Sequence, residues 1–200
     1  DLINKPKRPL AEYPNMKPYC ITLGAACLTF AIILSFLLNF YANIIVLCSA
    51  FFLMLYTPIL KKIPLLGNII VAFFLGLVFL FMEIALLERC SHLLIPAIIA
   101  FSISLIREII KDIEDYKGDK AASINTLAIC LGVKNTIYFS IILIIIFIMG
   151  LCFLIYHNID LYFSLATFFL VFIPLFYLIF FLIKSPTIKS CSEASNLLKK

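Results

Sequence analysis

Charged residues are scarce in this sequence. Only 14% of the 200 residues are Asp, Glu, Lys or Arg, whereas 64% are hydrophobic. A typical soluble domain is about 25% charged and about 45–50% apolar. The shortage of charge therefore excludes an ordinary soluble domain, a disordered chain and a fibrous protein, and it predicts a chain that is solvated by lipid.

Further absences narrow the class of protein. The net charge is only +5 and the sequence has no basic stripe, which excludes a nucleic-acid partner. The seven cysteines form no Cys-x-x-Cys pair and mostly lie in apolar runs, which favours small core residues over a disulfide framework. The chain also has no initiator Met and no signal peptide, and we expect it to be truncated at both ends.

Long apolar runs fill most of the chain. A membrane-spanning helix needs about 20 mainly apolar residues, and the runs are continuous, whereas a membrane barrel strand would alternate over about ten residues. We therefore predict an all-α, polytopic membrane protein with six transmembrane helices, at residues 19–38, 42–57, 65–87, 92–110, 137–156 and 161–183.

The basic residues are distributed unevenly over the predicted loops. With six spans, all Lys and Arg residues except Arg89 lie on one side of the membrane. Lys and Arg accumulate in cytoplasmic loops. The pattern predicts a multi-pass protein of the cell membrane with both ends of this chain in the cytoplasm, and the long, charged links on that side are where we expect function.

The most informative segment runs from Arg107 to Lys120. We expect the fourth span to continue through it as helix as far as Gly118, which would place Asp112, Asp115 and Asp119 on one face. Glu108 would lie on that face one turn earlier, whereas Lys111 and Glu114 would point elsewhere. Clustered carboxylates with nearby cations suit Mg²⁺ and a diphosphate, but a solvated helix end at the membrane boundary has the same pattern.

Two other polar groups lie on the same predicted side. The opening segment carries Asp1, Asn4 and Arg8, which alone would be an ordinary positively charged loop. The segment from Tyr56 to Lys62 alone would be an interfacial tyrosine with two snorkelling lysines. Their common face with the acidic segment is a stronger indication of a functional site than any one of them.

Together these segments resemble the UbiA-type intramembrane prenyltransferases. REIIKDIEDYKGDK resembles the second Asp-rich motif of the family, DxxDxxxD, and YTPILKKIPLLGN resembles its Tyr-Thr/Ser-x-x-Leu-Lys segment. DLINKPKRPL resembles the end of its first motif, NDxxDxxxDxxNxxxxRP, with Asp1 as the last Asp. The order and the intervals of all three segments fit the family.

The resemblance implies an architecture. The family has nine helices, so the six predicted spans would be its helices 3–8, and residues 1–200 would form a single transmembrane prenyltransferase domain. The Asn and the first two Asp of the first motif would lie before residue 1. We therefore expect the chain by itself to be inactive.

The resemblance also implies roles for individual residues. Mg²⁺ would be the cofactor, and prenyl diphosphate would be one partner. The implied metal ligands are Asp1, Asp112, Asp115 and Asp119. The implied diphosphate or acceptor contacts are Asn4, Arg8, Lys61, Arg107, Lys111 and Lys120. The implied catalytic group is Asp112, Asp115, Lys61 and Tyr56.

Within the family, the acidic segment resembles most the archaeal-type members that attach a geranylgeranyl group to geranylgeranylglyceryl phosphate in ether-lipid synthesis. Two alternatives stay open. The acceptor could be an aromatic acid, as in quinone synthesis, or the chain could be a membrane cation transporter. A transport pathway usually carries ionisable residues deep in the membrane, and Glu83, near the end of a span, is the deep acidic candidate.

Overall fold

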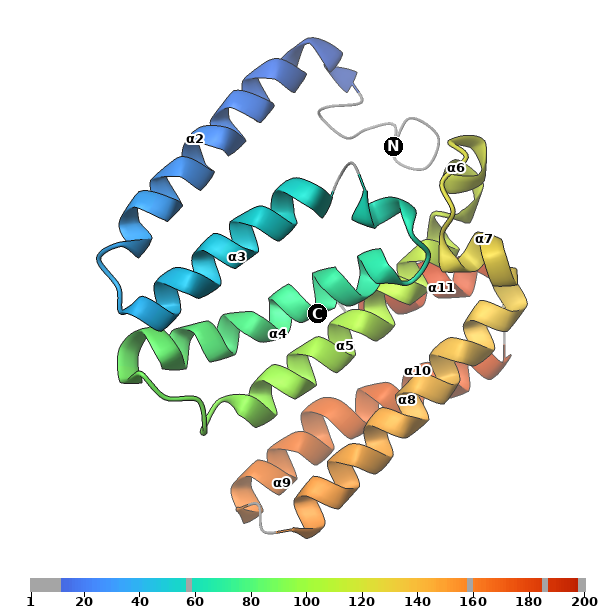
Figure 1. Cartoon of the computed structure of the whole chain (residues 1–200). Helices are drawn as coiled ribbons and strands as arrows, with labels where there is room; N and C mark the ends of the chain where they lie inside the picture. The colour runs from blue at the N-terminus through green and yellow to red at the C-terminus, as the bar shows by residue number, and fades with distance from the viewer. Residues whose placement is uncertain (1–11, 57–58, 158–159, 185–186, 198–200) are drawn as a thin grey trace. The chain divides into compact units, whose positions relative to one another are not determined.

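The computed structural model describes residues 12–56, 59–157, 160–184 and 187–197. Within these ranges every regular element is a helix, and no strand occurs (Figure 1). The predicted all-α class is therefore confirmed for the described residues. The chain divides into two compact units, which are residues 1–104 with 117–125 and residues 105–116 with 126–200.

The first unit contains a run of antiparallel helices. After a short turn, η1 (Pro14–Met16), Pro18 lies in the first turn of α2, where its missing N–H costs nothing. Consecutive helices pack side by side, α2 on α3 and α3 on α4. The elements are α2 (Lys17–Ser35), α3 (Phe40–Tyr56), η2 (Leu60–Lys62), α4 (Leu66–Leu87), the first part of α5 (Leu94–Glu114), and α6 (Tyr116–Ala121).

The second unit begins with the last turns of α5. Gly132 separates α7 from α8 with φ 80°, a conformation that glycine adopts without the strain of a Cβ. One face of α8 is buried, including Ile137, Ile144 and Leu151. The other elements are α7 (Leu127–Leu131), α8 (Val133–Tyr156), α9 (Leu161–Thr167), the π-helical turn η3 (Phe168–Phe172), α10 (Ile173–Lys184) and α11 (Ile188–Leu197).

Helices coincide with all six predicted apolar segments. Within the described residues, four helical segments are long and apolar enough to cross a membrane: α2, α4, α8, and the continuous run of α9, η3 and α10. The helix α3 is apolar but has only 17 residues, and α5 ends in charged residues. Many large apolar side chains point outward, such as Leu37 at 82% exposed and Leu170 at 76%. These helices fit a lipid environment.

One end of the first unit is held by polar contacts. The Asn39 side chain donates to the carbonyls of Ile84 (2.7 Å) and Ala85 (3.1 Å), and it accepts from the backbone N–H of Ala42 (2.9 Å). It therefore caps the start of α3 and satisfies the last carbonyls of α4. A hydrogen bond between Asn43 and Ser35 (3.0 Å) joins α3 to α2 near the same end.

Glu83 holds the turn between α4 and α5. Its carboxylate accepts backbone N–H bonds from Ser91 (3.1 Å), His92 (2.8 Å) and Leu93 (2.9 Å), directly before α5 begins. The residue is buried. The two helices approach closely at Gly76, where a Cβ would lie only 2.8 Å from the carbonyl oxygen of Ala97. The absence of a side chain at Gly76 permits this approach. These contacts set where α5 starts, and hence where its charged end lies along the helix axis.

The role of Glu83 leads to a stability prediction. Glu83→Ala removes the acceptor for three backbone N–H groups directly before α5, and it also removes the packing of a buried side chain. We expect the thermal unfolding midpoint of the detergent-solubilised protein to fall by several degrees. The matched control is Glu88→Gln, because Glu88 is exposed at the end of the same helix. An unchanged midpoint for Glu83→Ala would contradict this role.

Candidate active site

The last turns of α5 have two chemically different faces. Ile106, Ile109, Ile110 and Ile113 are all at most 2% exposed. At about 100° per residue they lie on one side of the helix, and the charged side chains lie on the opposite side. This charged arc spans about 140° of the helix surface by the same spacing, and it consists of Arg107, Glu108, Lys111, Asp112 and Asp115.

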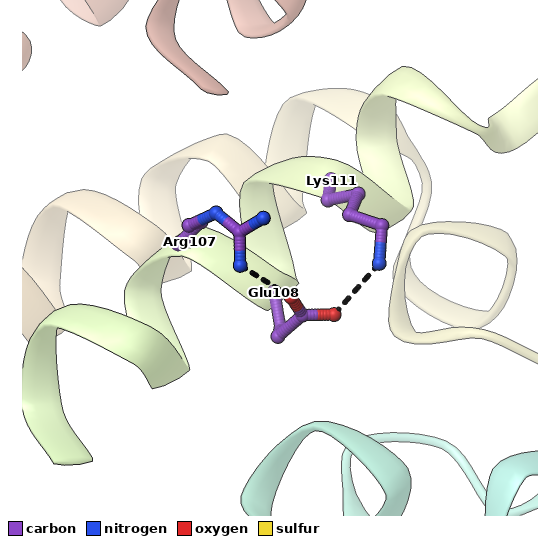
Figure 2. A network of polar contacts seen from close by, with 3 residues as sticks. All are labelled: Arg107, Glu108 and Lys111. Carbon is purple, nitrogen blue, oxygen red and sulfur yellow. Dashed lines mark hydrogen bonds and ion pairs between the residues drawn. The ribbon is translucent and has the colours of Figure 1, made fainter. Parts of the chain in front are cut away.

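Inside the charged arc, Glu108 pairs with two cations (Figure 2). One carboxylate oxygen lies 3.0 Å from Nη1 of Arg107, and the other lies 2.9 Å from Nζ of Lys111. The Glu108 side chain is 12% exposed, and those of Arg107 and Lys111 are 27% and 33% exposed. Lys111 was expected to point away from the face of the aspartates and Glu108, yet it pairs with Glu108, because residues three apart are neighbours on a helix.

The acidic segment is not one continuous helix. The helix α5 ends at Glu114, although the N–H of Asp115 still donates to the carbonyl of Lys111 (2.9 Å), and α6 begins at Tyr116. The predicted continuation to Gly118 was therefore wrong. Asp, Tyr and Gly are weak helix formers, and they follow one another closely here. The common face is supported for Asp112 and Asp115 alone.

Asp119 and Lys120 lie on α6, which the break separates from α5. They belong to the first unit, whereas Asp112 and Asp115 belong to the second. Asp119 is half-buried, and Lys120 is exposed. Their predicted roles in metal and phosphate binding therefore stay predictions.

Tyr56 and Lys61 lie in the first unit, at the end of α3 and in η2. Tyr56 is half-buried and Lys61 is exposed. A tight turn follows, in which the N–H of Leu66 donates to the carbonyl of Pro64 (2.8 Å) and Leu65 has φ 65°. Such turns with positive φ are rare and strained for residues other than glycine.

Gly67 sits beneath the turn that carries Lys61. A Cβ at this position would lie 3.3 Å from the Cα of Lys61 and 3.4 Å from the carbonyl oxygen of Leu60. Glycine therefore lets the start of α4 approach the Lys61 backbone. Gly67 was not among the predicted site residues, although a glycine three residues after Pro64 is a visible sign of close backbone approach.

An apolar groove of about 320 Å³ lies between α2, α3 and α4 of the first unit. Its lining includes Leu28 of α2, Phe74 and Phe81 of α4, and Ile45, Ser49 and Leu53 of α3. Tyr56 follows Leu53 by three residues, so the α3 wall of the groove continues to Tyr56 on one helix face.

The donor set can be compared with what Mg²⁺ requires. Among the described residues, no group of three or more His, Cys, Asp or Glu side chains is arranged to hold a metal ion. Mg²⁺ does not need such a cage, because it keeps several waters and is usually bound by one or two carboxylates plus substrate phosphates. Asp112 and Asp115 fit that requirement. Asp1, Asn4 and Arg8 lie outside the described residues.

A feature that the sequence analysis did not identify is the environment of Cys191 on α11. The residue is fully buried. Burial and the negative charge of Glu114, at the end of α5, raise the pKa of the Cys191 thiol to about 12. The amphipathic α11 thus packs within the second unit close to the helix that carries the charged arc. Only a spatial neighbour could have revealed this, because the two residues are far apart in sequence.

The comparison with protein families identifies the class of protein. The UbiA prenyltransferase family matches residues 1–197. This match covers almost the whole chain, including the segments around Tyr56 and Arg107 that carry the resemblance. The chain belongs to the UbiA prenyltransferase family.

Within the family, the chain is similar to proteins that share one name. The chain is 38% identical over 208 aligned positions to digeranylgeranylglyceryl phosphate synthase of Saccharolobus solfataricus, covering 100% of this chain and 70% of that protein. It is 38% identical over 150 positions to the synthase of the same name from Sulfurisphaera tokodaii, covering 74% of this chain and 54% of that protein. The chain thus spans between about half and 70% of the length of these two relatives.

A solved structure is also similar to this chain. It comes from a structural study of digeranylgeranylglyceryl phosphate synthase in membranes, and it matches this chain with a TM-score of 0.68 and 33% sequence identity. The match covers 100% of this chain and 71% of that one. Fold and sequence similarity therefore lead to the same branch of the family.

The raised pKa of Cys191 leads to a prediction about thiol chemistry. At pH 8 the Cys191 thiol stays protonated and buried, and only the thiolate reacts with alkylating agents. Mass-spectrometric mapping after maleimide treatment in detergent should therefore find Cys130, which is exposed, modified well before Cys191. Equal rates at both positions would contradict the described packing of α11.

Proposed function

We propose that the protein transfers a geranylgeranyl group from its diphosphate to geranylgeranylglyceryl phosphate, forming an ether bond of a membrane lipid. One observation carries the proposal: a single helix face presents the cations Arg107 and Lys111 together with the carboxylates Asp112 and Asp115, in a chain of the UbiA family. The name shared by the relatives, digeranylgeranylglyceryl phosphate synthase, supports the choice of donor and acceptor.

The balanced reaction makes clear what the residues must do. The allylic C–O bond of the prenyl diphosphate breaks and diphosphate leaves with the bonding electrons. The hydroxyl oxygen of the acceptor forms the new C–O bond and gives its proton to a base. Negative charge therefore accumulates on the leaving diphosphate, and Arg107 and Lys111 would stabilise it through charge-assisted hydrogen bonds.

The aspartates would stabilise the negative charge of the diphosphate indirectly, by binding a metal ion. Asp112 and Asp115 would hold Mg²⁺, and by resemblance Asp119 and Asp1 would add ligands. When bound, the ion supplies positive charge that neutralises a diphosphate leaving group. The carboxylates by themselves would repel the diphosphate, which is the physical reason that the arc requires a cation.

The first unit offers a candidate site for the prenyl chain. The apolar groove along α3 offers hydrocarbon-lined space for a prenyl chain, and its α3 wall continues to Tyr56. Tyr56 and Lys61 would contact the diphosphate or orient the acceptor. The close approach of Gly67 to the backbone of Lys61 supports a fixed position for that lysine. Asn4, Arg8 and Lys120 complete the proposed phosphate contacts.

For the membrane arrangement, we propose that all six apolar segments cross the bilayer as the counterparts of family helices 3–8. The charged end of α5 would then lie at the cytoplasmic boundary. The bias of Lys and Arg toward one side of the sequence supports this orientation. A single transmembrane domain over residues 1–200 belongs to the same proposal.

The alternatives receive less support. The relatives described above are named digeranylgeranylglyceryl phosphate synthases, and none of them is named for an aromatic acceptor. For a cation transporter, Glu83 was the deep acidic candidate. Both of its carboxylate oxygens accept hydrogen bonds from the turn before α5, which is a structural role.

The metal role is tested by Asp112→Asn and Asp115→Asn in the full-length protein. Each change keeps the side-chain shape and removes one negative charge. We expect prenyl transfer from geranylgeranyl diphosphate to fall about 100-fold or more, the usual scale for losing an essential charge or metal contact. The assay follows radiolabelled lipid product at saturating Mg²⁺ concentrations.

Asp160→Asn is the matched control, because Asp160 is an exposed residue before α9 and should leave the rate unchanged. Near-normal turnover of both Asp112→Asn and Asp115→Asn would overturn the metal role. Offering geranylgeranylglyceryl phosphate and 4-hydroxybenzoate in parallel separates the acceptors, and exclusive use of the aromatic acid would overturn the ether-lipid assignment.

A further inference from the structure

Glu108 is the ion-pair partner of both cations of the charged arc, and neither the family resemblance nor the proposed function assigns it a role. Its two carboxylate oxygens are divided between two cations, Arg107 at 3.0 Å and Lys111 at 2.9 Å. The picture of the site shows the carboxylate between the two cationic groups (Figure 2). The three side chains together carry a single net positive charge.

The burial of Glu108 requires an explanation. The residue is 9% exposed, and a carboxylate loses much of its hydration at such a position. A buried ion pair seldom adds much net stability compared with apolar residues of similar size. The arrangement is therefore better explained by what it does to the geometry of Arg107 and Lys111 than by a gain in folding free energy.

The neighbours in the charged arc show what Glu108 prevents. Lys111 lies four residues before Asp115, and Arg107 lies four residues before Lys111, so all three share one side of the helix. Without Glu108, no carboxylate would separate the two cations, and the ammonium of Lys111 could turn toward the carboxylate of Asp112 or Asp115. There it would compete with any cation that the aspartates bind.

Glu108 leaves both cations able to bind an anion. In the observed contacts it engages one nitrogen of the Arg107 guanidinium and the single nitrogen of Lys111. A guanidinium has five N–H donors and an ammonium has three. Both groups can therefore be held in place by Glu108 and still donate to phosphate oxygens.

We propose that Glu108 is a positioning residue that fixes Arg107 and Lys111 for the prenyl diphosphate and keeps them away from Asp112 and Asp115. This inference rests on the proposed function. Glu108 acts through the two cations and does not itself contact the substrate, because a carboxylate would repel a diphosphate. Its removal should therefore weaken diphosphate binding more than it slows the chemical step.

The test is Glu108→Gln in the full-length protein, measured by steady-state kinetics with geranylgeranyl diphosphate. Gln keeps the shape of the Glu108 side chain, but its amide NH₂ replaces one of the two oxygens that hold Arg107 and Lys111. We expect KM for the diphosphate to rise about tenfold, the scale of one charge-assisted contact, while kcat changes less than about threefold. Glu193→Gln, at an exposed position of α11, is the matched control and should change neither constant.

Repeating the Glu108 substitution in a Lys111 variant distinguishes a positioning role of Glu108 from a purely structural one. In Lys111→Gln, one of the two cations is already lost, so adding Glu108→Gln should raise KM only about twofold further, by double-mutant-cycle logic. Glu108→Asp, which keeps the charge on a shorter side chain, should recover part of the affinity. The thermal unfolding midpoint of each variant is recorded to identify misfolded protein.

Two results would overturn the inference. One is a KM for Glu108→Gln within twofold of wild type. The other is an equal rise of KM in both backgrounds, which would mean that Glu108 acts independently of Lys111. Failure of the proposed function is a different result, since the wild-type protein would then transfer no prenyl group from geranylgeranyl diphosphate, and the inference would fall with it.

Discussion

An ionised side chain cannot face hydrocarbon without a partner, and the described structure depends on this constraint. In a chain that is 64% hydrophobic, the end of α5 gathers five ionisable residues on one side and four buried isoleucines on the other. The isoleucines anchor the helix, and the charged arc must face water, protein or a ligand. Glu108 neutralises part of the positive charge of Arg107 and Lys111, so two cations and two aspartates can share one short stretch of helix.

Other polar contacts are also placed where an apolar helix would leave backbone groups without partners. Glu83 satisfies three N–H groups before α5, and Asn39 satisfies groups at the ends of α3 and α4. Helix ends leave backbone groups without partners inside the helix, and these side chains supply them. The same side chains therefore stabilise the fold and determine where α5 begins. The position of the charged arc along the helix axis follows from that starting point.

Much of this was predictable from the sequence, because apolar runs and charge spacing are local signals. Helices occur at all six predicted segments, and the segment around Arg107 carries the charged arc. The end of α5 at Glu114 was not predictable, since it depends on weak local preferences around Asp115 and Gly118. The contacts of Glu83 with the turn and of Glu114 with Cys191 depend on tertiary proximity. The choice of Glu108 as the partner of Lys111 depends on side-chain rotamers, which periodicity does not specify.

The central claim is that the charged arc of α5 binds the diphosphate of a prenyl donor. The most direct test is a cryo-electron microscopy structure of the full-length protein with Mg²⁺ and geranylgeranyl thiolodiphosphate, which does not ionise readily. We expect phosphate oxygens at about 3 Å from Arg107 and Lys111, and Mg²⁺ at about 2.1 Å from oxygens of Asp112 or Asp115. A diphosphate bound away from α5, with no metal at either aspartate, would contradict the account.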